Sequence, residues 1–243
     1  MIRTRLTVAA ALLLALGYPA AAQERVFQLT PYIWGTGVGG SVSPVAGGPQ
    51  FRFDQGLSEV LDDLDSAFFL SGLFRQGRFV VIGDYSASSS SRAGTVPKLG
   101  IPARAQVEQS SLTLAAGYRA LDGERATVDY LVGLRHWDIK ARANTPVPGL
   151  AGRLSVDFTD PILVARTNLR LSDRWSATGY VDVGGFGAGS DMTAQLLATV
   201  NWQARDGLFL SAGYRHLQVD YHSDGRGVDA HFSGPVLGLS LQF

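Results

Sequence analysis

The sequence contains no cysteine. This absence excludes a disulfide framework and a thiolate metal site, because both require cysteine sulfur. It also excludes the acylated N-terminal cysteine of a lipoprotein. The fold must therefore be stabilised by packing, hydrogen bonds and ion pairs alone.

Long apolar runs and blocks of like charge are also scarce. Beyond residue 22, no apolar stretch reaches the roughly 20 residues that a membrane helix needs. A chain of this kind can cross a membrane only as a closed β-barrel, because in lipid only helices and closed barrels satisfy every backbone polar group. The 21 basic and 21 acidic residues include no basic block that could follow a phosphate backbone. We therefore expect no nucleic-acid partner.

The N-terminus has the parts of a secretory signal peptide. Two arginines within the first five residues precede the apolar run Leu6–Leu16, and the small residues Ala20–Ala22 follow. The apolar run is too short for a membrane anchor, which is the alternative. We predict a cleaved signal peptide at residues 1–22 and a β-barrel domain at residues 23–243. Cleavage leaves 19 basic and 21 acidic residues.

From residue 23 onward, apolar side chains alternate with small or polar ones. In the last segment Phe243, Leu241 and Leu239 share one face, whereas Gln242 and Ser240 share the other. The same alternation recurs in residues 111–118, 127–137, 175–185, 192–203 and 208–217. Apolar outside and polar inside is the pattern of a transmembrane barrel. A soluble β-sandwich, which also alternates, is the alternative.

The connections between these segments fall into two length classes. Four are tight and polar, at residues 75–78, 121–125, 172–174 and 205–207. Five are longer, at residues 41–65, 88–105, 140–157, 185–191 and 222–229. Short turns at one end and long loops at the other are typical of outer-membrane barrels. We predict an all-β, antiparallel up-and-down transmembrane barrel of ten strands, with eight as the alternative and both chain ends on the periplasmic side.

Aromatic residues lie near the ends of the predicted strands, where amphipathic rings can rest among lipid headgroups. They are Phe27, Phe74, Phe79, Trp175, Trp202, Phe209 and Phe243. A terminal aromatic such as Phe243 resembles the signal by which outer-membrane barrels are recognised for assembly. The expected partners are therefore outer-membrane lipid, lipopolysaccharide and the barrel assembly machinery, and the sequence does not identify a surface partner.

Four stretches resemble a widespread, largely uncharacterised family of Gram-negative outer-membrane β-barrel proteins, loosely similar to the transmembrane domain of OmpA. They are Thr30–Gly35, Leu57–Asp65, Asp182–Gly187 and Ser233–Pro235. The resemblance implies the fold and an outer-membrane location. It implies no catalytic residues.

Charged residues occur at positions that the alternation turns into the barrel. They are Asp84, Arg119, Asp129, Arg135, Arg166, Arg170, Asp182 and Arg215. Charges deprived of bulk water must be paired or hydrated. We expect them to form a ladder that fills the lumen, since a ten-stranded barrel is little wider than the eight-stranded kind that side chains can fill. The alternative is a narrow path for water or small ions.

The first long loop carries five carboxylates around the amphipathic segment Leu57–Leu64. They are Asp54, Glu59, Asp62, Asp63 and Asp65. Binding of a divalent cation near lipopolysaccharide is one interpretation, because hard cations take several oxygen ligands. A solvated acidic face is another, and a third is that the segment covers or enters the barrel mouth. The sequence contains no EF-hand, zincin motif, metal-spaced histidine pair or glycine-rich phosphate loop, so we expect no metal and no cofactor.

His231 and Ser233 give the sharpest enzyme hypothesis. Two residues apart on a strand, they share a face, so the imidazole could activate the hydroxyl for acyl transfer. Lipid A deacylase barrels have a similar H-x-S pair. No acid follows Ser233 to orient the histidine, and Asp220 or Asp229 would have to replace it.

Taken together, these patterns favour a small barrel with a structural or surface-interaction role. A narrow channel is the first alternative. A lipid A-modifying acyl hydrolase that uses His231 and Ser233 is the second.

Overall fold

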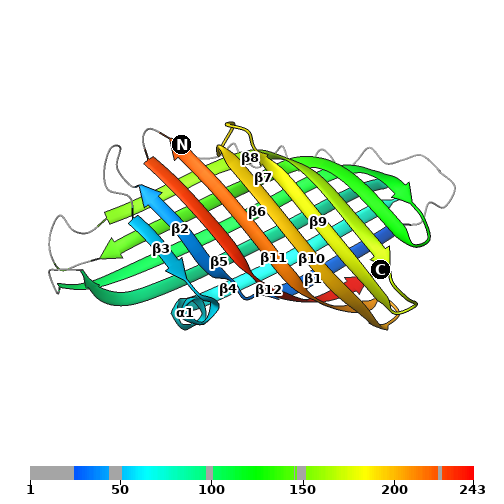
Figure 1. The fold of residues 1–243 in the computed structure, drawn as a ribbon, viewed down its shortest axis with the longest axis horizontal. Coiled ribbons are helices and arrows are strands. Elements are labelled where there is room, and N and C mark those ends of the chain that lie inside the picture. Colours follow the sequence, from blue (N-terminus) through cyan, green and yellow to red (C-terminus); the bar gives the residue numbers. More distant parts are fainter. Residues whose placement is uncertain (1–24, 44–50, 97–100, 145, 147–151, 224–225) are drawn as a thin grey trace, which may run out of the picture.

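The computed structural model describes residues 25–43, 51–96, 101–144, 146, 152–223 and 226–243 (Figure 1). The predicted signal peptide, residues 1–22, lies outside these ranges. The strands are β1 (Arg25–Trp34), β2 (Gly37–Ser43), β3 (Phe51–Gln55), β4 (Leu64–Gln76), β5 (Phe79–Val96), β6 (Ile101–Asp122), β7 (Ala126–Asn144), β8 (Gly152–Arg170), β9 (Trp175–Gly185), β10 (Met192–Arg205), β11 (Leu208–Ser223) and β12 (Arg226–Gln242), and the helix is α1 (Leu57–Asp63). Among the described residues, no helix is long and apolar enough to cross a membrane.

The strands form one closed antiparallel barrel. Neighbours along the chain pair from β4 through to β12, and β1 pairs with both β4 and β12. The closing ladder matches Tyr32 with Gly238 and Leu29 with Leu241. The predicted all-β fold with a ten-strand wall is therefore confirmed.

Two of the ten strand positions in the wall, which we call staves, are each built from two strand segments. Strand β1 pairs with the last part of β12, and β2 pairs with its first part, from Gly227 to Ser233. Likewise β4 pairs with β1, whereas β3 pairs with β2. Twelve segments therefore make ten staves.

The helix α1 interrupts the second stave, between β3 and β4, and projects from the side of the barrel (Figure 1). A Cβ on Gly35, at the break between β1 and β2, would lie 3.1 Å from Leu57 of α1 and 3.7 Å from Pro235. Glycine therefore allows the helix to approach the wall closely. The amphipathic segment was correctly recognised, and it lies beside the wall.

Four tight turns lie at one end of the barrel, which we call the short-turn end. They fall at residues 77–78, 123–125, 171–174 and 206–207, as predicted.

The opposite end, the long-hairpin end, differs from the prediction. Residues expected in the loops 88–105 and 140–157 instead extend β5, β6, β7 and β8 to within a few residues of each other (left in Figure 1). Ladder hydrogen bonds continue there although the side chains, such as Ser88–Ser91, are small or polar on both faces and give no apolar alternation.

The outer face is a band of exposed apolar side chains. On β12 and β11 it includes Leu237, Leu239, Leu210 and Tyr214, all at least 39% exposed. Other members are Ile33, Phe68, Tyr85, Leu112, Leu114, Tyr130, Val132, Leu134, Leu163, Val181, Val183, Leu196 and Val200. An apolar surface that encircles the wall fits a hydrocarbon environment, whereas a monomer in water rarely exposes so large a patch.

The C-terminal residue completes the closing seam. The backbone N–H of Phe243 donates to the carbonyl of Phe27 at 2.8 Å, and Phe27 donates to Phe243 at 3.1 Å. Their rings stack with centroids 6.3 Å apart. Phe243 is nevertheless 73% exposed, so its ring is available to other molecules.

We expect the folded barrel to migrate faster on SDS gels before boiling than after it. A closed wall has no free edge at which unfolding by detergent can begin, so the unheated protein should stay compact. The measurement compares unheated and boiled samples of refolded protein whose β-sheet content has been checked by circular dichroism. Equal migration of the two samples would contradict the closed barrel.

Candidate functional site

The inward face of the barrel gathers buried charges into three groups. Arg119, Asp129, Arg135, Asp182 and Arg215 are all at most 9% exposed. They come from four different strands, and each sits at an alternate position that its strand turns inward. Burial of unpaired charge is costly, so the pairing of each group decides whether the lumen is stable.

The first group centres on Arg135 of β7 and Asp182 of β9. The two terminal nitrogens of Arg135 donate to the two oxygens of Asp182, at 3.0 Å and 2.6 Å. The Nε of Arg135 donates to Thr113 at 3.0 Å, and the hydroxyl of Tyr180 donates to Asp182 at 2.7 Å. A two-pronged pair with extra donors is the geometry in which a buried ion pair offsets its desolvation.

The second group joins Arg215 of β11 to Asp84 of β5 across the lumen. Arg215 Nη2 donates to Asp84 Oδ1 at 3.1 Å and to Gln195 Oε1 at 2.6 Å. The Tyr32 hydroxyl accepts from Arg215 at 2.6 Å and donates to Asp84 at 2.9 Å. The guanidinium also lies over the ring of Trp34, 4.5 Å from its centroid. Opposite walls of the barrel are therefore linked.

The third group lies nearer the short-turn end. Asp129 accepts from Arg119 Nε at 2.8 Å and from Arg166 Nη1 at 3.1 Å. Arg119 also contacts Asp122 at 3.4 Å. Two arginines thus share one fully buried carboxylate, with the partly exposed Asp122 beside it.

Arg170 does not join these groups. It lies at the end of β8, with its side chain 59% exposed, and pairs with Asp173 of the following turn at 3.3 Å. Its alternate position was recognised, but the strand ends there and the side chain reaches solvent. Placing Arg170 in the lumen network was therefore wrong.

Several residues that take part in the polar contacts of the lumen were missed by the sequence analysis. Asp160 is fully buried, and both the backbone N–H and the hydroxyl of Ser190 donate to it, at 2.6 Å and 2.9 Å. It shares the inward alternation of Arg166 on β8, and that pattern could have revealed it. Tyr32, Tyr180 and Gln195 were missed because an uncharged polar residue gives little signal in a sequence.

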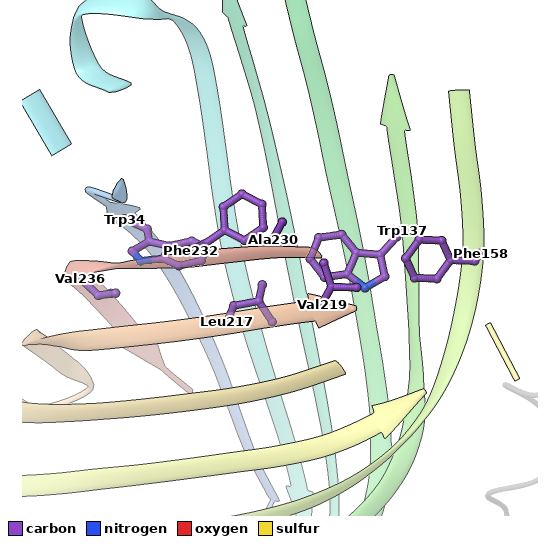
Figure 2. Packing of buried hydrophobic residues seen from close by; sticks show 8 residues of the cluster. All are labelled: Trp34, Trp137, Phe158, Leu217, Val219, Ala230, Phe232 and Val236. Atoms are coloured by element: carbon purple, nitrogen blue, oxygen red, sulfur yellow. The ribbon is translucent and has the colours of Figure 1, made fainter. Parts of the chain in front are cut away.

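A cluster of aromatic and aliphatic side chains closes the lumen on the long-hairpin side of the charges. We call it the apolar plug: Trp34, Trp137, Phe158, Leu217, Val219, Ala230, Phe232 and Val236 (Figure 2). Its rings make a chain from wall to wall, with centroids of Trp34 and Phe232 6.3 Å apart, Phe232 and Trp137 6.5 Å apart, and Trp137 and Phe158 6.3 Å apart. The sequence did not predict this plug, because its members occupy inward positions, which the barrel pattern assigns to small or polar residues.

A cavity of about 380 Å³ extends from the charged groups towards the short-turn end, and Asp84, Arg119, Arg166 and Arg215 are part of its lining. Amide and hydroxyl groups line it, among them Thr30, Ser240, Thr178 and Asn201. They bond one another: Thr30 and Ser240 oxygens are 2.7 Å apart, and Asn201 donates to Thr178 at 3.0 Å. The lumen therefore has two regions, a cavity lined by polar and charged groups towards the short turns and the apolar plug on the long-hairpin side.

His231 and Ser233 share the outward face of β12, as predicted, but they do not bond each other. The Ser233 hydroxyl lies 2.5 Å from Nδ1 of His216, on the neighbouring strand β11. The His231 ring stacks on His216, with centroids 6.4 Å apart, and lies against Gly39. In the described chain, no carboxylate hydrogen-bonds either imidazole. The orienting acid that acyl transfer needs is thus missing from both histidines.

The carboxylates of the first long loop remain dispersed. Glu59 accepts from the backbone N–H of Gly56 at 3.1 Å, and Asp65 accepts from Ser91 at 3.0 Å. In the described part of this loop, no three of the carboxylates bring ligand atoms together. The geometry supports the solvated acidic face more than a cation site.

We expect replacement of Asp182 by Asn to destabilise the barrel by about 3–5 kcal/mol, because it leaves Arg135 buried without its counter-charge. The measurement is the temperature at which the compact gel band is lost. Asp173→Asn is the matched control, since Asp173 pairs with Arg170 in solvent and should change little. Equal stability of the Asp182→Asn variant and the unmutated protein would contradict the pairing.

A comparison with solved structures finds outer-membrane proteins among those similar to this chain. The outer membrane protease OmpT from Escherichia coli superposes with a TM-score of 0.57 at 10% identity, over 93% of this chain and 99% of that chain. Ail of Yersinia pestis gives 0.39 at 13% identity, over 91% and 99%, and Neisserial surface protein A gives 0.38 at 13%, over 91% and 100%. No protein-family model matches the chain, and no curated protein matches it. The similarity to OmpT concerns the fold alone: the chain is folded as an outer-membrane β-barrel.

Proposed function

We propose that the protein resides in the outer membrane as a closed barrel with a structural or surface-interaction role. The observation that carries this proposal is the chain of packed rings across the lumen, from Trp34 through Phe232 and Trp137 to Phe158. A solute path would have to cross both this apolar layer and the paired charges beneath it. Within the described part of the chain, the apolar plug interrupts the polar lining of the lumen.

The channel alternative has less support. Four arginines of the lumen, Arg119, Arg135, Arg166 and Arg215, have carboxylate partners within 3.1 Å. Ions are conducted where charged side chains face water and bind weakly enough to release them. Guanidinium groups held by carboxylates instead cross-link the wall.

The exposed strand extensions support a surface role. Strands β5 to β8 continue beyond the apolar band as two hairpins (Figure 1). Their outward side chains are polar there, as in the pairs Lys140–Asp138 at 2.9 Å and Arg142–Glu108 at 3.4 Å. Such a surface suits contact with lipopolysaccharide and with molecules outside the cell.

We propose further that the protein is exported to the outer membrane and that it is related to the uncharacterised outer-membrane family. Residues 1–22 would direct export, and Phe243, with its exposed ring, would be recognised by the barrel assembly machinery. The four stretches that resemble the uncharacterised outer-membrane family lie in the wall, in α1 and in β12. The acyl-hydrolase alternative has less support, because Ser233 bonds a histidine that no acid orients.

We expect liposomes that contain the purified protein to exclude a disaccharide in a swelling assay. The apolar plug and the paired charges should leave passage to water or small ions at most. In the double variant Trp137→Ala/Phe232→Ala, conductance to small ions should rise, because the wall-to-wall chain of rings is broken. The matched control Trp175→Ala/Trp202→Ala removes two neighbouring rings from outward positions and should not change it. Rapid disaccharide uptake through the unmutated protein would contradict the closed lumen.

We also expect amine-reactive labelling of intact cells to mark the long-hairpin end. The chain has two lysines, Lys98 and Lys140. The Lys140 side chain lies at this end and is 42% exposed, and Lys98 falls in the sequence between β5 and β6. A membrane-impermeant reagent should therefore modify the protein without cell lysis. The Lys98→Arg/Lys140→Arg variant keeps the charge and should lose the label. If unmutated protein is labelled only after lysis, the surface-exposed orientation is wrong.

A further inference from the structure

We propose that Asp191, Asp220 and His222 bind a divalent transition-metal ion, with Zn²⁺ as the best fit, at the long-hairpin end of the barrel. Asp220 and His222 lie on the outward face of β11, and Asp191 ends the β9–β10 loop. One ligand atom from each residue lies within 4.8 Å of the other two. All three side chains are partly exposed to solvent.

The three side chains converge on a single imidazole nitrogen. His222 Nδ1 lies 2.9 Å from Asp191 Oδ2 and 3.0 Å from Asp220 Oδ1. An imidazole Nδ1 carries at most one hydrogen, so it can donate to only one of these oxygens. Asp220 Oδ1 is the oxygen left over: it is buried and has no hydrogen-bond partner in the described chain. The close approach of Asp220 to His222 is thus a contact without a donor.

A metal ion satisfies all three atoms at once. The Nδ1 lone pair and one oxygen of each carboxylate would all face the ion, at about 2.0–2.2 Å. Ligands around a tetrahedral ion of this size are about 3.4 Å apart, so small side-chain rotations suffice. Asp229 lies directly opposite Asp220 in the ladder and adds a third carboxylate to the surroundings. Like charges opposite each other destabilise a sheet, and a cation would relieve this repulsion.

The backbone holds two of the ligands in place. The N–H of Asp191 donates to the carbonyl of Asp220 at 2.9 Å, which ties the loop to β11. The His222 ring lies over Gly227 of β12, where a Cβ would come within 2.6 Å of the ring. Glycine at this position therefore leaves the imidazole room to lie flat and face the carboxylates.

The donor set indicates the class of ion. One imidazole and two carboxylates suit Zn²⁺ and similar transition metals, whereas Ca²⁺ and Mg²⁺ prefer oxygen ligands only. Three protein ligands leave a fourth position for water or for an anionic group outside the protein. The site is distinct from the lumen and faces the same side as the extended hairpins.

The test is calorimetric titration of Zn²⁺ into the refolded, chelator-treated barrel in detergent. We expect one site of micromolar affinity or tighter. His222→Ala and Asp191→Asn should weaken binding at least tenfold, and so should Gly227→Ala, which displaces the ring without removing a ligand. The compact unheated gel band verifies the fold of each variant.

His231→Ala is the matched control, because His231 forms an outward pair with His216 that could itself take up zinc. It should leave the affinity unchanged. Three results would overturn the proposal: no zinc binding by the unmutated barrel, equal binding by His222→Ala, or loss of binding in His231→Ala instead. Tighter binding of Ca²⁺ than of Zn²⁺ would overturn the assignment of the ion class.

Discussion

Closure of the wall by the pairing of β1 with β12 is the interaction on which the rest of the structure depends. In hydrocarbon each unpaired backbone N–H or carbonyl costs several kcal/mol, so an open edge is not tolerated. The ladder that ends at Phe27 and Phe243 removes this edge. Once the wall is closed, each strand has an outward face, where the exposed apolar side chains lie, and an inward face that lines a narrow lumen. The composition of both faces follows from this separation.

Buried charges lie inside the barrel and need counter-charges, whereas the band on the outer face is apolar. Four of the arginines that enter the lumen, Arg119, Arg135, Arg166 and Arg215, have Asp84, Asp129 and Asp182 as their counter-charges. Because each pair joins different strands, the ion pairs also cross-link the wall. The apolar plug then separates these charges from the long-hairpin end. Ion pairs and the apolar plug together fill much of the described lumen, and a cavity lined by polar and charged groups lies towards the short turns.

Polar chemistry on the outer face begins where the apolar band ends. On β11 the outward residues change from Leu210 and Tyr214 to His216, Asp220 and His222 within a few positions. These groups lie beyond the apolar band and are at least partly exposed, so they can bind ions or polar partners at little desolvation cost. The two functional proposals therefore concern the same end of the molecule, where the hairpins and the carboxylate–histidine group lie.

The sequence by itself determined the wall. Apolar alternation has a period of two along a strand, so it identified the barrel, its four tight turns and the inward positions of Arg135, Asp182 and Arg215. It could also have identified Asp160, which follows the same alternation. The lengths of β5 to β8 could not be predicted, because backbone ladders continue where the side chains carry no apolar signal.

Only the tertiary structure decided which inward and outward residues meet. Asp84 lies 131 positions from Arg215, yet closure brings the pair to 3.1 Å across the lumen. Closure and register likewise place His216, not His231, against Ser233. His216 lies directly opposite Ser233 in the ladder between β11 and β12, whereas His231 lies two residues from Ser233 on the same strand. Arg170 shows the converse: its alternation was correct, but the end of β8 left it in solvent. Alternation fixes the face on which a side chain lies, whereas contacts depend on register, curvature and strand length, which arise only when the whole wall has closed.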